Sequence, residues 1–202
     1  VPSDADMQNY TQHYTYDKIG NMLVLQNIGG SSWTRYYNYD FNTNNYLLSN
    51  NEGSFTYDAH GNTTSMPHLS LMQWDFADRL KSVSNGTFTS YYNYDSSGER
   101  SRKVVIKGNI KEERYYIGGY EVFRKYVNNS LDTERTTLHV MDDTKTVALV
   151  ETLTIENGTP CSPSVVEVRY QYDNHLGSAC LELDENADVI SYEEYHPFGT
   201  TS

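Results

Sequence analysis

Aromatic and polar residues alternate in short runs along the chain, and most of these runs end in an aspartate. In the first run, one polar residue separates Tyr14 from Tyr16, and Asp17 and Gly20 follow. Side chains at positions i and i+2 lie on one face of a β-strand, so the two rings share a face. The Asp carboxylate can accept hydrogen bonds from nearby backbone N–H groups, and the Gly can adopt the positive φ of a turn. The pattern predicts a β-hairpin with an aromatic stripe.

The run occurs six times, and its first five copies are spaced by roughly 20 residues, which is typical of stacked repeat architectures. The repeated positions are Tyr14, Tyr16 and Asp17; Tyr37, Tyr39 and Asp40; Tyr57 and Asp58; Trp74 and Asp75; Tyr92, Tyr94 and Asp95; and Tyr170, Tyr172 and Asp173 with Gly177. We assign the aromatic residues to packing in the sheet and the aspartates to its turns.

A second alternating block lies toward the C-terminus. Apolar residues between Val147 and Ile155 share one face of a predicted strand, with Glu151 as the exception. Asn157 and Gly158 then form a strong hairpin signal. In the next strand, an apolar face alternates with a polar face, which predicts a sheet with one face in water. The apolar face comprises Val166, Val168, Tyr170 and Tyr172, and the polar face Glu167, Arg169 and Gln171.

Hairpins account for nearly the whole chain, because helical signals are almost absent. We predict a hairpin array in residues 1–125, an irregular polar connection with one short strand at residues 136–140 in residues 126–145, and a second β segment in residues 146–202. We expect an all-β fold in which successive antiparallel hairpins form one long, curved and twisted sheet.

Two ordered motifs stand in the closing stretch. They read His175-Leu176-Gly177-Ser178 and Tyr195-His196-Pro197-Phe198-Gly199. In this order and at this spacing they resemble the core that accompanies RHS repeats. Together with the Tyr-Asp repeats, the resemblance to RHS/YD-repeat proteins covers nearly the whole chain. It extends to the shells of Tc toxin B and C components and of bacterial polymorphic toxins.

The resemblance implies a long β-sheet that spirals into a hollow cocoon around a toxic effector. The chain would be a structural wall segment with no catalytic residues, and its partners would be the remainder of its own shell and the enclosed effector. We expect a bacterial virulence protein that is secreted or lies at the cell surface. Family members usually continue to an Asp-Pro self-cleavage motif and a variable effector. This sequence ends at Ser202 without an Asp-Pro motif or an effector, and it begins at Val1 rather than at an initiator Met. We therefore expect a piece of a longer chain.

An alternative is a cell-surface or glycan-binding module in a wall-associated or teneurin-like protein. Tyr rings stack on sugars while their hydroxyl groups form hydrogen bonds, so the Tyr pairs could form a carbohydrate platform. This alternative assigns no particular binding residue. Exposed Tyr pairs on an outer face would favour it, whereas rings that face a lumen would favour the shell.

Charge narrows the class of partner. The 202-residue chain has 27 acidic and 15 basic residues, with a formal net charge of −12. This balance argues against nucleic acid or an anionic membrane as partner, because both would repel the chain. The chain also lacks an apolar run approaching the ~18 residues that a membrane-spanning helix needs.

Candidate chemical sites have simpler structural explanations. Asp173, His175 and Ser178 are the residue types of a catalytic triad, but they lie within one predicted turn, whereas a triad brings residues from separate elements. Residues 184–188 begin like a calcium loop, yet Val189 and Tyr195 stand where an EF-hand needs Gly and Glu. We therefore expect no cofactor and no metal.

The two cysteines, Cys161 and Cys180, are too few for a disulfide framework or a zinc site. Cys180 lies in an apolar run, so we expect a buried free thiol there. A bridge between Cys161 and Cys180 is the alternative.

Overall fold

The structure is a computed structural model that describes residues 9–143 and 145–198. Every regular element in these ranges is a β-strand, β1 to β18. No helix in the described residues is long and apolar enough to cross a membrane. The chain divides between Thr89 and Ser90 into two compact units.

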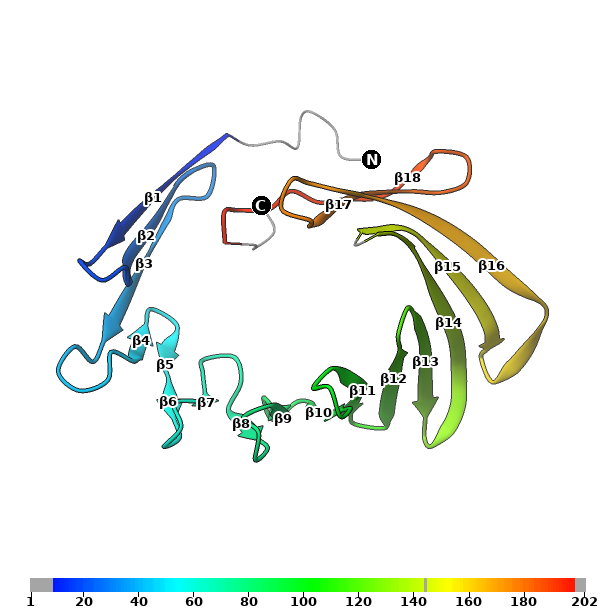
Figure 1. Cartoon of the computed structure of the whole chain (residues 1–202), viewed down its shortest axis with the longest axis horizontal. Helices are drawn as coiled ribbons and strands as arrows, with labels where there is room; N and C mark the ends of the chain where they lie inside the picture. Colours follow the sequence, from blue (N-terminus) through cyan, green and yellow to red (C-terminus); the bar gives the residue numbers. More distant parts are fainter. Residues whose placement is uncertain (1–8, 144, 199–202) are drawn as a thin grey trace. The chain divides into compact units, whose positions relative to one another are not determined.

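The N-terminal unit contains short strands in three groups, shown in blue to green in Figure 1. A five-stranded antiparallel sheet follows chain order from β1 to β5, β6 and β7 form a two-stranded sheet, and β8 pairs with β9. Their bounds are β1 (Tyr10–Tyr16), β2 (Met22–Gly29), β3 (Trp33–Tyr39), β4 (Leu47–Asn50), β5 (Gly53–Ser54), β6 (Thr56–Tyr57), β7 (Thr63–Ser65), β8 (Leu71–Trp74) and β9 (Leu80–Ser84).

The C-terminal unit is a sheet in which each strand lies beside the next one in the chain. Every pair from β11 to β18 is antiparallel. The bounds are β10 (Thr89–Tyr94), β11 (Arg100–Lys107), β12 (Ile110–Ile117), β13 (Tyr120–Val127), β14 (Ser130–Asp142), β15 (Lys145–Glu156), β16 (Thr159–Asp173), β17 (Ala179–Leu183) and β18 (Val189–Tyr192). The predicted all-β fold of successive antiparallel hairpins is confirmed.

The region predicted as an irregular connection, residues 126–145, is instead mostly strand. β14 spans Ser130–Asp142, and the short strand expected at residues 136–140 lies in its C-terminal half. The polar composition misled the prediction because these side chains find partners on neighbouring strands. For example, Glu134 pairs with Arg124 at 2.7 Å, and Arg135 lies 3.4 Å from Glu151. The Asn157 and Gly158 hairpin turn is confirmed, with φ of 50° and 74°.

The sheet has almost no buried core. Among the described residues, the buried apolar side chains are Met72, Val83, Val104 and Ala148. The register places Val166, Val168 and Tyr170 on one face of β16, as predicted. This face is not covered, however, since Val166 is 59% exposed and Tyr172 is 53% exposed. This face of the sheet is therefore not covered by a second layer.

Candidate functional site

A repeated hydrogen-bonded loop, here called the Asp turn, follows the aromatic strand ends. At Asp58, the backbone N–H donates to the Asn62 carbonyl at 3.0 Å, and the Gly61 N–H donates to the Asp58 carbonyl at 3.2 Å. The Asp58 Oδ1 accepts from the N–H groups of His60 and Asn62, both at 2.9 Å. One carboxylate oxygen thus holds the backbone across the whole loop.

The same four hydrogen bonds occur at Asp17, Asp75 and Asp95. Three positions after each aspartate stands a residue with positive φ: Gly20, Gly61, Asp78 and Gly98. Asp40 forms a longer version, in which its N–H donates to the Tyr46 carbonyl and Asn45 has the positive φ. The predicted role of these five aspartates in turns agrees with this geometry.

The sixth predicted position is wrong by one residue. Asn174, not Asp173, accepts the N–H groups of Leu176 and Ser178, at 2.9 and 3.1 Å. Asp173 is the last residue of β16. The spacing could have revealed this, because the positive-φ residue follows three positions after the acceptor, and Gly177 lies four positions after Asp173.

A further Asp turn lies in the stretch first considered as a calcium loop. The Asp184 Oδ1 accepts from the N–H groups of Asn186 and Asp188, both at 2.8 Å, and Ala187 has a φ of 65°. The sequence concealed this copy because Ala is rare at positive φ. The carboxylate holds backbone, and no cluster of metal-ligating residues is found in residues 9–143 and 145–198.

These hydrogen bonds lower the pKa of five turn aspartates, Asp17, Asp40, Asp58, Asp75 and Asp95. For Asp58, desolvation raises the pKa, but hydrogen bonds from the side chain and backbone of Asn62 and the backbone of His60 outweigh it. For Asp95, the Ser97 hydroxyl lowers the pKa most, and the N–H groups of Glu99 and Ser97 add to the effect. The ionised form is favoured because it is the better acceptor.

The aromatic residues lie where the repeat predicts them. They occupy β1 (Tyr14, Tyr16), β3 (Tyr37, Tyr39), β6 (Tyr57), β8 (Trp74), β10 (Tyr92, Tyr94) and β16 (Tyr170, Tyr172). Five of these strands end at the aromatic residue before the aspartate. The rings of Tyr14 and Tyr16 stack with centroids 6.4 Å apart, and the ring centroids of Tyr57 and Tyr46 are 4.5 Å apart.

The closing motifs are placed in two turns. Gly177 has a φ of 79° in the Asn174 turn, and Pro197 and Phe198 form a turn after Tyr195. Tyr195 itself donates a hydrogen bond to the Ala179 carbonyl at 2.7 Å. Gly199 lies outside the described residues.

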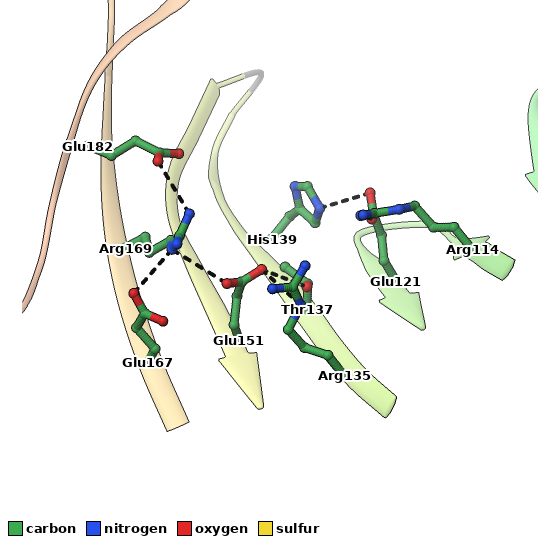
Figure 2. A network of polar contacts seen from close by, with 9 residues as sticks. All are labelled: Arg114, Glu121, Arg135, Thr137, His139, Glu151, Glu167, Arg169 and Glu182. Atoms are coloured by element: carbon green, nitrogen blue, oxygen red, sulfur yellow. Dashed lines mark hydrogen bonds and ion pairs between the residues drawn. The ribbon is translucent and has the colours of Figure 1, made fainter. Parts of the chain in front are cut away.

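A charged row, which the sequence reading did not identify, crosses β12 to β17 on one face of the C-terminal unit (Figure 2). Register places Glu121, Thr137, Glu151 and Glu167 opposite one another on adjacent strands. The full row comprises Arg114, Glu121, Arg135, Thr137, His139, Glu151, Glu167, Arg169 and Glu182.

Glu151 is the centre of this row and is only 9% exposed. Its Oε1 lies 3.4 Å from the Arg135 Nε and accepts a hydrogen bond from Thr137 at 3.4 Å. Its Oε2 lies 3.4 Å from the Arg169 Nε. Two cations therefore flank one buried carboxylate. The signal in the sequence was Glu151 itself, the one charged residue on an otherwise apolar face.

Arg169 and Glu121 extend the row in opposite directions. Arg169 also contacts Glu167 at 3.3 Å and Glu182 at 3.5 Å. It therefore lies between three carboxylates, of which Glu151 and Glu167 are opposite each other in the register. Glu121 pairs with Arg114 and lies 3.3 Å from the His139 Nε2. Cross-strand pairs of opposite charge stabilise the register of a sheet.

The triad-like residues are placed by the Asn174 turn. His175 is exposed in that turn, and the Ser178 N–H donates to Asn174. Cys161 and Cys180 are both free and half-buried, so Cys180 is less buried than expected. The Cys180 thiol lies 3.3 Å from the Tyr172 carbonyl oxygen.

Comparison with known proteins gives similarity along nearly the whole chain. No family model matches it. Toxin subunit YenC1 of Yersinia entomophaga is 27% identical over 96% of this chain and 22% of its own length. Toxin subunit YenC2 of the same organism is 25% identical over 100% of this chain and 23% of its own length. The tRNA nuclease WapA of Bacillus subtilis (strain 168) is 37% identical over 52% of this chain and 4% of its own length.

The fold is also similar to part of a solved structure. The crystal structure of TcdB2-TccC3 superposes with a TM-score of 0.77 over 95% of this chain and 10% of the other, at 24% identity. The complex TcdB2-TccC3-Cdc42 gives a TM-score of 0.76. The chain thus spans less than a quarter of the curated toxin subunits that it matches. The predicted resemblance to RHS/YD-repeat proteins is confirmed.

Proposed function

We propose that this chain is a structural wall segment of an RHS/YD-repeat shell that encloses a toxin polypeptide. Its similarity to the YenC toxin subunits along nearly its whole length supports a component of a Tc-type shell. Its share of those subunits, about a fifth, supports a segment rather than a complete shell.

The observation that carries the proposal is the single layer of the sheet. An ordinary domain buries one face of its sheet against a second layer. In the described residues of this chain, four apolar side chains are buried, and large apolar side chains such as Val166 and Tyr172 remain exposed. A wall needs two faces, one toward each side of the shell. Strand pairing, Asp turns and cross-strand charges such as the charged row can hold such a wall together.

The partners follow from this role. The remainder of the same shell would extend the sheet, and a toxin polypeptide would occupy the enclosed space. We place the whole assembly outside the producing bacterial cell or at its surface, as a secreted virulence factor. The segment itself has no catalytic role in this proposal, and its match to the nuclease WapA covers only 4% of that protein.

Limited proteolysis of the longer natural protein would test the proposal. Sequencing the coding region after Ser202 first identifies the polypeptide that follows. Within the intact protein, that polypeptide should resist protease, whereas the same polypeptide expressed alone should be cleaved rapidly. Equal cleavage rates in the two settings would contradict enclosure.

A second candidate, a glycan-binding surface module, is favoured by the exposure of Tyr170 and Tyr172, at 43% and 53%. Exposed rings on an outer face could stack on sugars. If this is the function, Tyr170→Ser and Tyr172→Ser should abolish binding to a panel of bacterial and host glycans without lowering stability. Absence of binding by the parent chain would exclude it.

A further inference from the structure

The two-stranded sheet β6–β7 is a weakly paired link within the N-terminal unit. Its ladder joins Thr56 to Ser65 and Tyr57 to Thr63, with a register shift between the two pairs. An isolated hairpin of this size is marginally stable in water. Its position therefore depends on side chains that reach from it to the neighbouring elements.

Three hydrogen bonds connect β6–β7 to the β8–β9 hairpin. The Trp74 Nε1–H donates to the Thr63 carbonyl at 2.8 Å. At the turns, the Asp78 Oδ1 accepts from the Asn62 Nδ2 at 2.8 Å and lies 2.9 Å from the His60 Nδ1. Consecutive Asp turns are thus joined directly, side chain to side chain.

The joint between these two hairpins is also hollow. A recess of about 540 Å³ lies there, and its lining includes Trp74, His60 and Asp78. The other charged residues that line this recess are Asp58, Asp75 and Lys81. Asp75 is paired with Arg79 at 2.8 Å, which leaves Asp58 and Asp78 to favour a cationic imidazole.

The pKa shifts of His60 and Asp78 agree with this arrangement. The hydrogen bond and the charge of Asp78, then the charge of Asp58, raise the pKa of His60. Hydrogen bonds from Asn62 and His60 lower the pKa of Asp78.

We propose that His60 and Asp78 form an acid-strengthened clasp that fixes the β6–β7 sheet against the β8–β9 hairpin. A cationic His60 contributes fully below the ordinary imidazole pKa, and its contribution is lost as pH rises through the raised value. Asp78 stays ionised until pH falls through its lowered pKa. The clasp is therefore tight at mildly acidic pH and loosens at neutral to alkaline pH, while the Asn62 bond to Asp78 persists. This device does not depend on the shell function.

The pair is solvent-exposed, with side-chain exposures of 64% for His60 and 49% for Asp78, so a local probe is needed rather than global stability. The chain has two tryptophans, and a Trp33→Phe background leaves Trp74, at the recess, as the sole fluorophore. We would follow Trp74 emission and the His60 ring signals by NMR from about pH 5 to about pH 8. The His60 midpoint should lie above that of an ordinary histidine, and Trp74 emission should change with the same midpoint.

Asp78→Asn is the discriminating variant, because Asn tolerates the positive φ of 55° at this position and keeps the turn. It should lower the His60 midpoint and remove the coupled change at Trp74, and His60→Gln should also remove that change. The matched control is His68→Gln, in an exposed turn of the same unit, which should leave the Trp74 profile unchanged. The clasp would be overturned if Trp74 emission still changed with pH in the His60→Gln variant, or if Asp78→Asn left the titration midpoint of His60 unchanged.

Discussion

At the scale of the residue, the Asp turn depends on one oxygen atom that accepts two backbone N–H groups. Asn174 supplies this acceptor without a charge, with the same partners two and four positions ahead as Asp95. The hydrogen-bond acceptor, rather than the negative charge, is therefore the common requirement of these loops. The charge adds a contribution that depends on pH.

Substitutions at two turns test this requirement. Asp95→Ala and Asn174→Ala should lower the urea midpoint of unfolding, because two backbone N–H groups lose their acceptor in each case. Asp95→Asn should retain most of the stability, and Asp173→Ala, outside the turn's hydrogen bonds, should change little. If Asp173→Ala were as damaging as Asn174→Ala, the assignment of the turn to Asn174 would be wrong.

The charge of Asp95 gives a prediction for pH. Its pKa is lowered in the folded chain, so ionised Asp95 contributes stability above its unfolded pKa and loses it as pH falls through the folded value. Parent and Asp95→Asn should therefore differ at neutral pH and converge in acid, below about pH 4. Urea unfolding of both proteins across this range measures the difference. A stability difference between the two proteins that stays constant across this pH range would show that the charge of Asp95 contributes nothing.

At the scale of the element, strands in a single layer have no second layer to fix their register. The charged row fulfils that function in β12 to β17, because all of its ion pairs except Arg169 with Glu167 join residues of different strands. Only the contacts that bury a carboxylate contribute much, since exposed ion pairs are weak. Glu151 meets this condition, and Glu167, with a side chain 50% exposed, does not.

Glu151→Ala should therefore destabilise the C-terminal unit by about 1–3 kcal/mol, since Thr137, Arg135 and Arg169 all lose a partner that is shielded from water. Glu167→Ala is the matched control on the same row, and its effect should be under about 0.5 kcal/mol. Chemical denaturation of both variants gives the comparison. A double-mutant cycle with Arg135→Ala should reveal coupling. Equal effects at residues 151 and 167 would exclude a special role for the buried carboxylate.

The sequence predicts elements well where their signal is local. The Tyr-x-Tyr-Asp runs correctly place the ends of β1, β3 and β10, and the Trp74 and Asp75 pair correctly marks a strand end and a turn. Only residues 136–140 of β14 were predicted, because its polar side chains find their partners on other strands, which no local pattern reveals. The charged row was missed for the same reason, since its members come from six strands and only register brings them together.

At the scale of the whole molecule, the chain combines a net charge of −12 with apolar surface that it leaves uncovered. Net charge opposes association, whereas exposed apolar side chains and open strand edges promote it. The apolar surface includes Ile117, Leu138 and Val166, at 65%, 47% and 59% exposure. These residues lie on β12, β14 and β16, which are alternate strands of one sheet, and the register places them on the same face, which a flanking segment could cover.

We expect the isolated chain to self-associate or to need flanking protein for stability. β18 and β1 each end a sheet in the described residues, and an unpaired edge is a template for another strand. Sedimentation velocity at several concentrations should show oligomers, and higher salt should increase them by screening the repulsion between acidic chains. A charged substitution on the apolar face, Val166→Lys, should reduce association, whereas Glu185→Lys in the Asp184 turn should not. A compact, stable monomer at all concentrations would contradict the expectation and would argue that the chain is a self-sufficient domain.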